Sequence, residues 1–343
     1  MSQTTTASAG KTLDADGPDT VRLNETEAAA VGMRALKAIG YSDEDAKIVV
    51  DQLIDNALCG YRFASLPRIL AIATDPKHLR GRKPIRIVHE TPLSALMDGG
   101  NNVGYVTCYR AARLAAEKAK KSGFASVGVY DSYYSGRNAY FVEQVVKEGL
   151  VCFHTSSAQP RVLPIGGTRP ALGTNPICFG FPSANGPVIV DMGTAALMWG
   201  DVMLQAHLGE PLPEGIGFDK VGNPTTDAAA VLEGGVVPFG GHKGFGLSIA
   251  VQALGLLAGA PLAQGWIADY GFLFWALDPK LMLPGGEFPA QMAELVQKIK
   301  ATPKRPGVEE IRIPSERAYR ERERRRKEGL VYDRKVIDSL NAL

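Results

Sequence analysis

Helix and strand patterns alternate along residues 106–191, and this alternation is the strongest constraint on the fold. Val106–Ser122 has the spacing of an amphipathic helix, and Ala125–Tyr130 carries the β-branched residues typical of a strand. The pattern continues with a helix at Asn138–Glu148 and strands at Leu150–Thr155, Ile177–Phe181 and Val188–Asp191. Such alternation predicts an α/β domain with a largely covered sheet.

Both ends of the chain are predicted to be helical. Asn24 and Ser42 are of the residue types that cap helix N-termini, and acidic residues follow them in the first turn. The last long helix is predicted at Pro314–Lys327. Residues 1–20 are rich in Ser, Thr, Ala, Gly and Asp, which predicts a disordered tail. The 343 residues are enough for one large domain or two ordinary ones.

A glycine-rich turn carrying one lysine precedes a long apolar segment at Phe239–Ala260. Glycines in the turn let the backbone bend and let a ligand approach, and a helix start suits an anion such as phosphate. Lys243 would add a full positive charge. The turn is therefore either a phosphate cradle or a hinge before a core helix, because Leu247–Leu257 has the composition of a buried helix.

Several common nucleotide-binding and catalytic motifs are missing from the sequence. No G-x-G-x-x-G follows a strand pattern, and there is no G-x-x-x-x-G-K-[ST], G-x-S-x-G or H-E-x-x-H. These absences exclude the Rossmann fingerprint and the P-loop. The five histidines do not cluster at metal-ligand spacing, so we predict no metal site.

The charge pattern predicts no nucleic-acid partner. The formal net charge is only +2. The arginines of Pro314–Lys327 alternate with glutamates, and pairs such as Glu321 and Arg325 lie at i,i+4, which is typical of a solvated helix face. Phosphate binding by these arginines is the alternative.

The cysteines and the apolar runs bear on the compartment. Four cysteines lie in apolar or mixed segments without a CxxC pair, which predicts reduced core thiols in a cytoplasmic protein: Cys59, Cys108, Cys152 and Cys178. No signal peptide is visible at the N-terminus. The longest apolar stretch, Leu247–Ala263, is too short and too rich in glycine to predict a membrane span.

Five segments carry the likeness of one enzyme family. They are Leu172–Pro182, Val190–Thr194, Pro224–Asp227, Pro238–Gly246 and Arg312–Arg317. In this order and at these spacings, the chain resembles the malate/L-lactate dehydrogenase family of the non-Rossmann kind. That family includes ureidoglycolate dehydrogenases, diketogulonate reductases, sulfolactate dehydrogenases and cyclic-imine carboxylate reductases.

The resemblance implies a non-Rossmann NAD(P)-binding α/β sheet domain at residues 85–240. It implies a mostly helical domain formed by the N- and C-terminal segments, residues 21–84 and 241–343. It also implies NAD or NADP as cofactor, a small carboxylate as substrate, and a homodimer. Which of the two cofactors is used stays open.

Cofactor contacts follow from the matched motifs. The resemblance implies contacts from Tyr134, Ser135, Gly136, Arg137, Asp191, Met192, Gly193, His242, Lys243, Pro314, Ser315, Glu316 and Arg317. Ser315 stands where the family usually has glycine. Thr174 would touch the substrate, and Asp201 stands where the imine-reducing branch has a carboxylate in its proton relay. A turn hydroxyl and a surface acid are the alternative interpretations of these two residues.

Two family histidines are replaced by tyrosines in this chain. Counting back from Leu66-Pro67-Arg68, Tyr61 replaces the proton-donating histidine and Ser65 replaces an arginine, while Tyr134 replaces a histidine of the Asn-His-Phe-Gly motif. Hydride reduction of C=O or C=N needs a proton, and tyrosine releases one only near pH ~10 unless nearby cations lower its pKa. It can also hydrogen-bond the developing oxyanion. Tyr61 is alternatively an aromatic core residue.

The leading hypothesis is an NAD(P)H-dependent oxidoreductase acting on a 2-oxo or 2-hydroxy acid or on a cyclic 2-imino carboxylate. Tyr61, Asp201 and Tyr134 are its candidate catalytic residues, and Ser65 and Thr174 are candidate substrate contacts. Arg62, Arg68 or Arg137 would bind the substrate carboxylate in place of the missing arginine. The alternative is a nucleotide-binding protein that has lost or altered the hydride-transfer chemistry.

Overall fold

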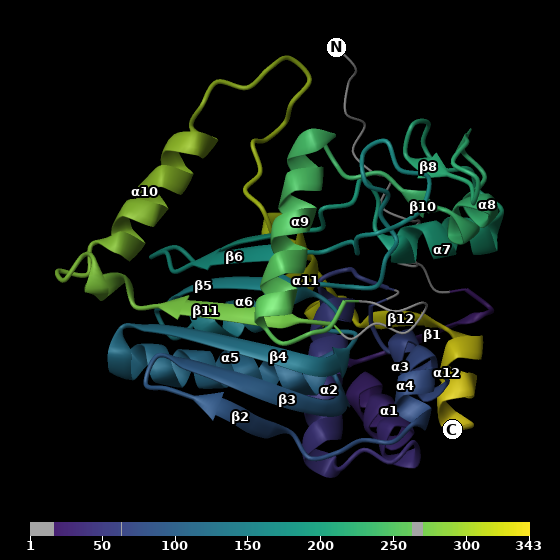
Figure 1. Ribbon diagram of the computed structural model, residues 1–343, viewed down its shortest axis with the longest axis horizontal. Coiled ribbons are helices and arrows are strands. Elements are labelled where there is room, and N and C mark those ends of the chain that lie inside the picture. The colour runs from purple at the N-terminus through teal and green to yellow at the C-terminus, as the bar shows by residue number, and fades with distance from the viewer. Residues whose placement is uncertain (1–16, 63, 263–269) are drawn as a thin grey trace. The chain divides into compact units, whose positions relative to one another are not determined.

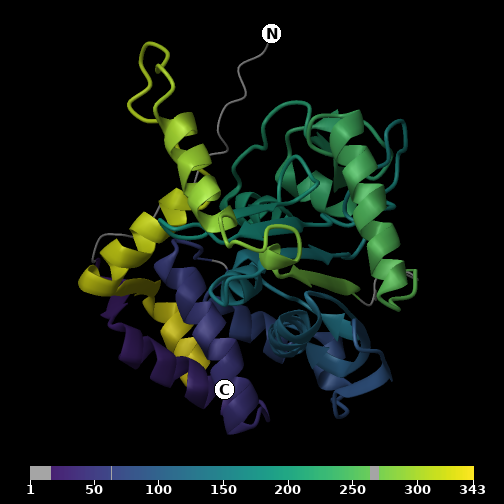
Figure 2. The same ribbon diagram turned by 90° about the vertical axis from the view of Figure 1, so that its left-hand side faces the viewer.

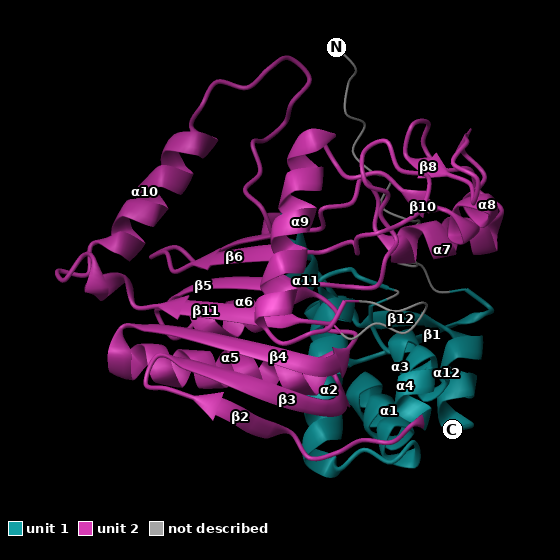
Figure 3. Cartoon of the chain, in the orientation of Figure 1, with its two compact units in different colours: residues 1–79, 317–343 teal, residues 80–316 magenta. Residues whose placement is uncertain are grey.

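The computed structural model describes residues 17–62, 64–262 and 270–343. The chain divides into two compact units, one formed by residues 1–79 and 317–343 and the other by residues 80–316 (Figure 3). The predicted α/β class is confirmed by the mixed sheet and its flanking helices. No helix among the described residues combines the length and apolar character that crossing a membrane requires.

The first unit is mostly helical and joins the two ends of the chain. Its elements are β1 (Thr20–Leu23), α1 (Glu25–Ala38), α2 (Asp43–Leu58), α3 (Pro67–Ala73), α4 (Pro76–Leu79), α11 (Glu316–Glu328), β12 (Leu330–Asp333) and α12 (Arg334–Asn341). The predicted caps are confirmed, since Asn24 forms a capping box with Glu27 and the side chain of Ser42 accepts from the N–H of Asp45.

Two long-range contacts hold the termini of this unit together. Strand β1 pairs with β12 in antiparallel register, so Thr20, which was predicted to lie in the disordered tail, is part of a strand. Arg322 of α11 binds Asp55 of α2 through its Nε at 3.0 Å, and both side chains are largely buried. Residues 1–16 of the predicted tail lie outside the described residues.

The second unit is built on a seven-stranded sheet in the order β2-β3-β4-β11-β5-β6-β7. Its strands are β2 (Arg86–Glu90), β3 (Ser94–Val103), β4 (Phe124–Tyr133), β5 (Val151–Ser156), β6 (Ile177–Phe181), β7 (Val188–Met192) and β11 (Phe272–Leu277). Only β3 and β4 pair in parallel, and the other neighbours are antiparallel.

Helices cover both faces of this sheet. Helices α5 (Gly104–Ser122) and α6 (Asn138–Val146) pack on one face, and α9 (His242–Leu257) packs on β5 and β11 from the other (Figure 1). After a short 3-10 turn at Pro279–Leu281, α10 (Phe288–Lys300) stands away from the sheet in both views (Figure 1 and Figure 2).

A small lobe of the same unit has its own core. It contains α7 (Trp199–Leu208), α8 (Ala228–Glu233) and the three-stranded sheet of β8 (Gly217–Phe218), β9 (Pro224–Thr225) and β10 (Gly235–Val236). Val162, Val202, Val231 and Val236 are fully buried at its centre. Trp199 and Phe245 pack against this core.

The unit boundaries differ from the predicted domains for residues 241–316, which belong with the sheet and not with the helical segments. The reason is β11, which pairs with β4 on one side and β5 on the other in the middle of the sheet. A strand in this position places the segments on either side of it in the same unit as the sheet.

Helix α9 is less buried than its composition predicts. Only Gly244, Ser248, Val251 and Gly255 are buried, and a Cβ at Gly255 would lie 2.3 Å from Ser157 Oγ. Small residues therefore form the face that packs on the sheet, because the helix approaches it closely. Leu256 and Leu257 point away and are 44% and 69% exposed, so the prediction of a buried helix is wrong for this face.

Candidate functional site

The candidate residues fall into two groups, one in each unit. The first unit contains Tyr61, Arg62, Ser65, Arg68 and Arg317, and the second contains all the others. The structure brings together residues within each group.

The glycine-rich turn forms an open start to α9. Gly240 and Gly241 have φ values of 55° and 61°, in the left-handed region that favours glycine. A Cβ at either position would meet nothing within 4 Å, whereas one at Gly244 would lie 2.1 Å from the Phe239 carbonyl oxygen. His242 and Lys243 follow as the first two residues of the helix, and both are exposed. Open backbone, helix N–H groups and a lysine together suit a phosphate.

Backbone hydrogen bonds connect this turn to two other candidate segments. The N–H of Phe239 donates to the carbonyl of Thr194 at 3.0 Å, and the N–H of Ala196 donates to Val237 at 2.8 Å. The N–H and the hydroxyl of Thr194 both donate to the Thr174 carbonyl, at 2.9 and 3.1 Å. The segments that contain Thr174, Gly193 and His242 therefore lie side by side, although they are far apart in the sequence.

Asn175 is a residue of this site that sequence analysis did not single out. It is fully buried with a φ of 34°, and its Nδ2 donates to the Ser248 carbonyl in α9 at 2.9 Å. Its Oδ1 accepts from the N–H of Ala158 at 3.1 Å. Asn175 thus fixes the Thr174 segment to α9. The Gly-Thr-Asn-Pro motif, which contains Asn175, is the sequence signal that could have identified this residue.

Asp191 of β7 connects to the start of α6. Its Oδ2 accepts from the N–H of Ala139 at 2.8 Å. Burial raises the pKa of Asp191, while the backbone N–H of Ala139 and the charge of the buried Arg137 oppose that rise. Asp191 and Arg137 therefore stabilise each other and position the turn before α6. Met192, the next residue, is exposed.

The turn that replaces the Asn-His-Phe-Gly motif has an unusual backbone. Tyr134 has a φ of 45°, which is uncommon for a bulky residue and typical of functional turns. Its ring lies 6.3 Å from that of Tyr270 in an edge-on arrangement. Ser135 is buried, and a Cβ at Gly136 would lie 2.7 Å from the Tyr105 ring, so the turn packs tightly on α5.

The Pro314–Glu316 segment lies along β7. Ser315 has a φ of 68° and its Oγ donates to the Ile189 carbonyl at 2.9 Å. The left-handed φ explains why glycine suits this position in the family. The Glu316 carboxylate binds Lys300 Nζ at 2.6 Å and accepts from the N–H of Ile313 at 3.1 Å, so both partners lie in the second unit. Pro314 is exposed.

Asp201 lies in the first turn of α7, two residues after Trp199. The residue is exposed as a whole, yet partial desolvation of its carboxyl group raises its pKa. A carboxyl group whose pKa is raised by its surroundings is a candidate for proton transfer.

In the first unit, Tyr61 is 38% exposed, and the Arg317 guanidinium carbon lies 5.6 Å from the centre of its ring. Such exposure does not fit the alternative of an aromatic core residue. Ser65 is buried and its hydroxyl donates to the Arg62 carbonyl, so it stabilises the local turn. The Arg62 side chain is exposed, and that of Arg68 is half-buried.

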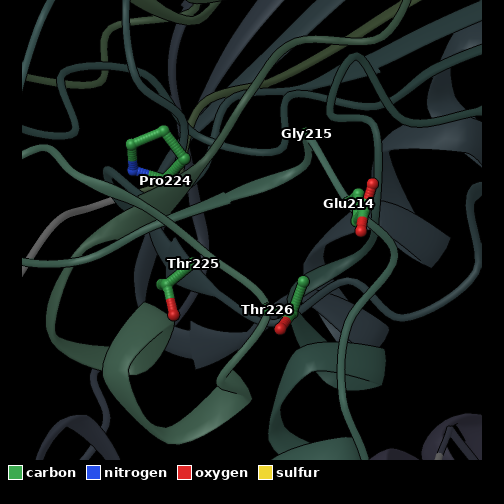
Figure 4. Close-up of a pocket in the computed structure, with 5 residues that line it drawn as sticks. All are labelled: Glu214, Gly215, Pro224, Thr225 and Thr226. Carbon is green, nitrogen blue, oxygen red and sulfur yellow. The ribbon is translucent and has the colours of Figure 1, made fainter.

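A depression of about 530 Å³ lies in the small lobe, lined by Glu214, Gly215, Pro224, Thr225 and Thr226 (Figure 4). Its lining has one carboxylate and no basic side chain, which does not suit an anionic ligand. The neighbouring Asp227 caps α8 by accepting from the N–H of Ala229 at 2.9 Å. We therefore assign the Pro224–Asp227 motif a local structural role.

Known proteins similar to this chain are dehydrogenases and reductases. It is 34% identical to malate/(S)-sulfolactate dehydrogenase of Methanothermus fervidus over 338 residues, which cover 94% of this chain and 96% of that protein. It is 36% identical to a Delta(1)-pyrroline-2-carboxylate/Delta(1)-piperideine-2-carboxylate reductase of Pseudomonas putida over 249 residues, covering 68% of this chain and 70% of that protein.

Solved structures show the same fold. Malate dehydrogenase of Pyrococcus horikoshii superposes with a TM-score of 0.85 at 28% identity, covering 95% of both chains. Delta1-piperideine-2-carboxylate reductase of Pseudomonas syringae superposes with a TM-score of 0.83 at 27% identity, covering 94% of this chain and 99% of that one.

The fold and the relatives define an oxidoreductase of the dehydrogenase and reductase class, which implies a nicotinamide cofactor. The malate/L-lactate dehydrogenase family profile matches residues 23–341, and the chain belongs to this family. The resemblance inferred from the motifs is therefore confirmed.

Proposed function

We propose that this enzyme transfers hydride between NAD(H) or NADP(H) and a small 2-oxo or 2-hydroxy acid, or a cyclic 2-imino carboxylate. The relatives act on substrates of both kinds, as their names state. The observation that carries the proposal is the hydrogen-bonded assembly of the Thr174, Thr194 and Phe239 segments at the start of α9.

The residues of the second unit fit a dinucleotide. The open backbone of Gly240 and Gly241 and the exposed Lys243 suit its pyrophosphate. His242 would contact the same cofactor. Asp191 and Ser315 would position their segments of the site through Ala139 and Ile189. A reduced nicotinamide, when bound, supplies the hydride.

Proton transfer would be the task of Tyr61, Asp201 and Tyr134. Tyr61 is exposed beside the Arg317 guanidinium and would offer a phenol hydroxyl as a hydrogen-bond donor. Partial desolvation raises the pKa of Asp201, which supports a part for its carboxyl group in proton transfer. Tyr134 would hold its hydroxyl at the site through its constrained turn.

The decisive experiment is a screen of NADH and NADPH oxidation over 2-oxo acids and cyclic 2-imino carboxylates. Tyr61→Phe, Tyr134→Phe and Asp201→Asn are compared with the wild type. Loss of a proton donor should lower kcat by roughly 100-fold or more, and in Tyr61→Phe and Asp201→Asn it should do so without weakening cofactor binding. A wild type that binds NADH but reduces nothing in the screen would favour the alternative of lost or altered hydride chemistry.

We also propose that the protein is a homodimer in the cytoplasm. Exposed apolar side chains on α9 and α10, such as Leu256 and Leu295, support burial against a second copy. All four cysteines are buried free thiols, as a reducing compartment permits. Sedimentation equilibrium should give twice the mass of the chain, and a concentration-independent monomer would contradict the dimer.

A further inference from the structure

Arg161 lies beside the candidate site, and no family motif includes it. It follows β5 in the long loop between β5 and β6. Its N–H donates to the Leu172 carbonyl at 2.8 Å, and its own carbonyl accepts from Val236 at 3.0 Å. The backbone of Arg161 is therefore fixed between the segment that leads to Thr174 and the small lobe.

Its side chain lies among aromatic groups. The guanidinium carbon lies 4.5 Å from the centre of the Trp199 ring, in the first turn of α7. Tyr134 and Tyr270 are close enough to act on its charge, and their two rings touch each other edge-on. Arg161 is only half-buried, so solvent reaches this group of side chains.

Two of the aromatic residues around this arginine are part of, or next to, the candidate machinery. Tyr134 is a candidate catalytic residue, and Trp199 precedes the relay candidate Asp201 by two positions in the same helical turn. Burial lowers the pKa of Arg161, and the two tyrosines oppose this change, so the guanidinium keeps its charge in a partly apolar setting.

We propose that Arg161 binds the carboxylate of the substrate, with its guanidinium stacked on the Trp199 ring. A planar guanidinium presents parallel N–H groups to a carboxylate, and stacking on an aromatic ring fixes its plane. Gln159, whose Oε1 accepts from Nη2 at 3.4 Å, holds one branch of the fork in place. This inference rests on the proposed function and replaces Arg62, Arg68 and Arg137 as the carboxylate clamp.

The binding test uses two carboxylates, oxamate and pyrrole-2-carboxylate, and the neutral pyrrole-2-carboxamide. Calorimetric titration in the presence of NADH compares the wild type with Arg161→Gln and Arg161→Lys. The matched control is Arg169→Gln, an exposed arginine of the same loop. We expect Arg161→Gln to weaken binding of at least one carboxylate by roughly 10- to 100-fold, with no effect on the carboxamide or on NADH. Arg161→Lys should bind the carboxylate more tightly than Arg161→Gln and less tightly than the wild type.

Two outcomes would overturn the proposal. One is a wild type that binds neither carboxylate. The other is a carboxylate affinity that is the same in Arg161→Gln and in the control. Turnover separates this inference from the proposed function. Reduction of a 2-oxo acid with a KM unchanged in Arg161→Gln refutes the role of Arg161 alone. Carboxylate binding that depends on Arg161 without any turnover refutes the hydride chemistry alone.

Discussion

The carboxylate of Asp191 on β7 caps helix α6 by accepting a 2.8 Å hydrogen bond from the backbone N–H of Ala139. The two residues belong to different elements, so this contact fixes the end of a strand to the start of a helix. The buried Arg137, two residues before Ala139, also acts on this carboxylate through its charge. The turn that carries Tyr134 therefore depends on a residue that sequence analysis assigned to the cofactor.

Replacement of Asp191 should destabilise the second unit. Asp191→Ala removes the cap and leaves the buried Arg137 without its neighbouring charge, so we expect a loss of about 2–3 kcal/mol in the free energy of unfolding. Asp191→Asn keeps an acceptor and should cost about 1 kcal/mol. Urea unfolding measures both, and an unchanged midpoint in Asp191→Ala would show that the cap does not matter.

Substitutions of Ser315 distinguish two contributions to stability, the backbone strain at this position and the hydrogen bond of its side chain. Ser315→Ala keeps the left-handed φ and loses the bond to the Ile189 carbonyl, so we expect a loss of about 1–2 kcal/mol. Ser315→Gly loses the same bond but relieves the strain, and its stability should lie within about 0.5 kcal/mol of the wild type. Thermal unfolding of the three proteins ranks them, and an alanine variant as stable as the glycine variant would refute the argument.

Lys243 is expected to act on cofactor binding and not on stability. Its side chain is exposed at the start of α9, so Lys243→Met should leave the unfolding midpoint unchanged. Loss of a charge-assisted contact to phosphate should weaken NADH or NADPH binding by roughly 10- to 100-fold. The matched control is Lys220→Met, which changes an exposed lysine of the small lobe. Equal affinities in the two variants would remove Lys243 from the cofactor site.

His154 should make the protein sensitive to acid. Its ring is fully buried 3.8 Å from the Phe274 ring, and its Nδ1 lies 3.0 Å from the Leu273 carbonyl oxygen. Burial lowers the pKa of His154 from 6.5 to about 3. The unfolded chain therefore binds a proton below pH 6.5 that the folded chain does not accept until about pH 3.

The stability contributed by the neutral ring is complete above pH 6.5 and declines as the pH falls toward 3. The expected slope is about 1.4 kcal/mol per pH unit from this residue alone. His154→Phe should be less stable near neutral pH, because it loses the contact with Leu273, but it should decline less steeply on acidification. Urea midpoints at a series of pH values measure the difference, and parallel curves for the two proteins would contradict it.

The sequence by itself determined the features that depend on neighbouring residues. Asn24 and Ser42 start their helices as predicted, since a cap acts within one turn of chain. The glycine-rich turn before α9 and the strand patterns of the sheet were also visible, because periodicity reflects which face of an element is covered.

Only the tertiary structure decided which distant segments meet. The position of β11 between β4 and β5 depends on hydrogen bonds between strands far apart in the chain, and no local pattern records such partners. No local pattern records the hydrogen bond between Asp191 and Ala139 of α6 or the stacking of Arg161 on Trp199 either. Periodicity also could not show that α9 packs through its glycines. The helix is apolar on all sides, so its sequence does not reveal which face lies on the sheet and which faces solvent.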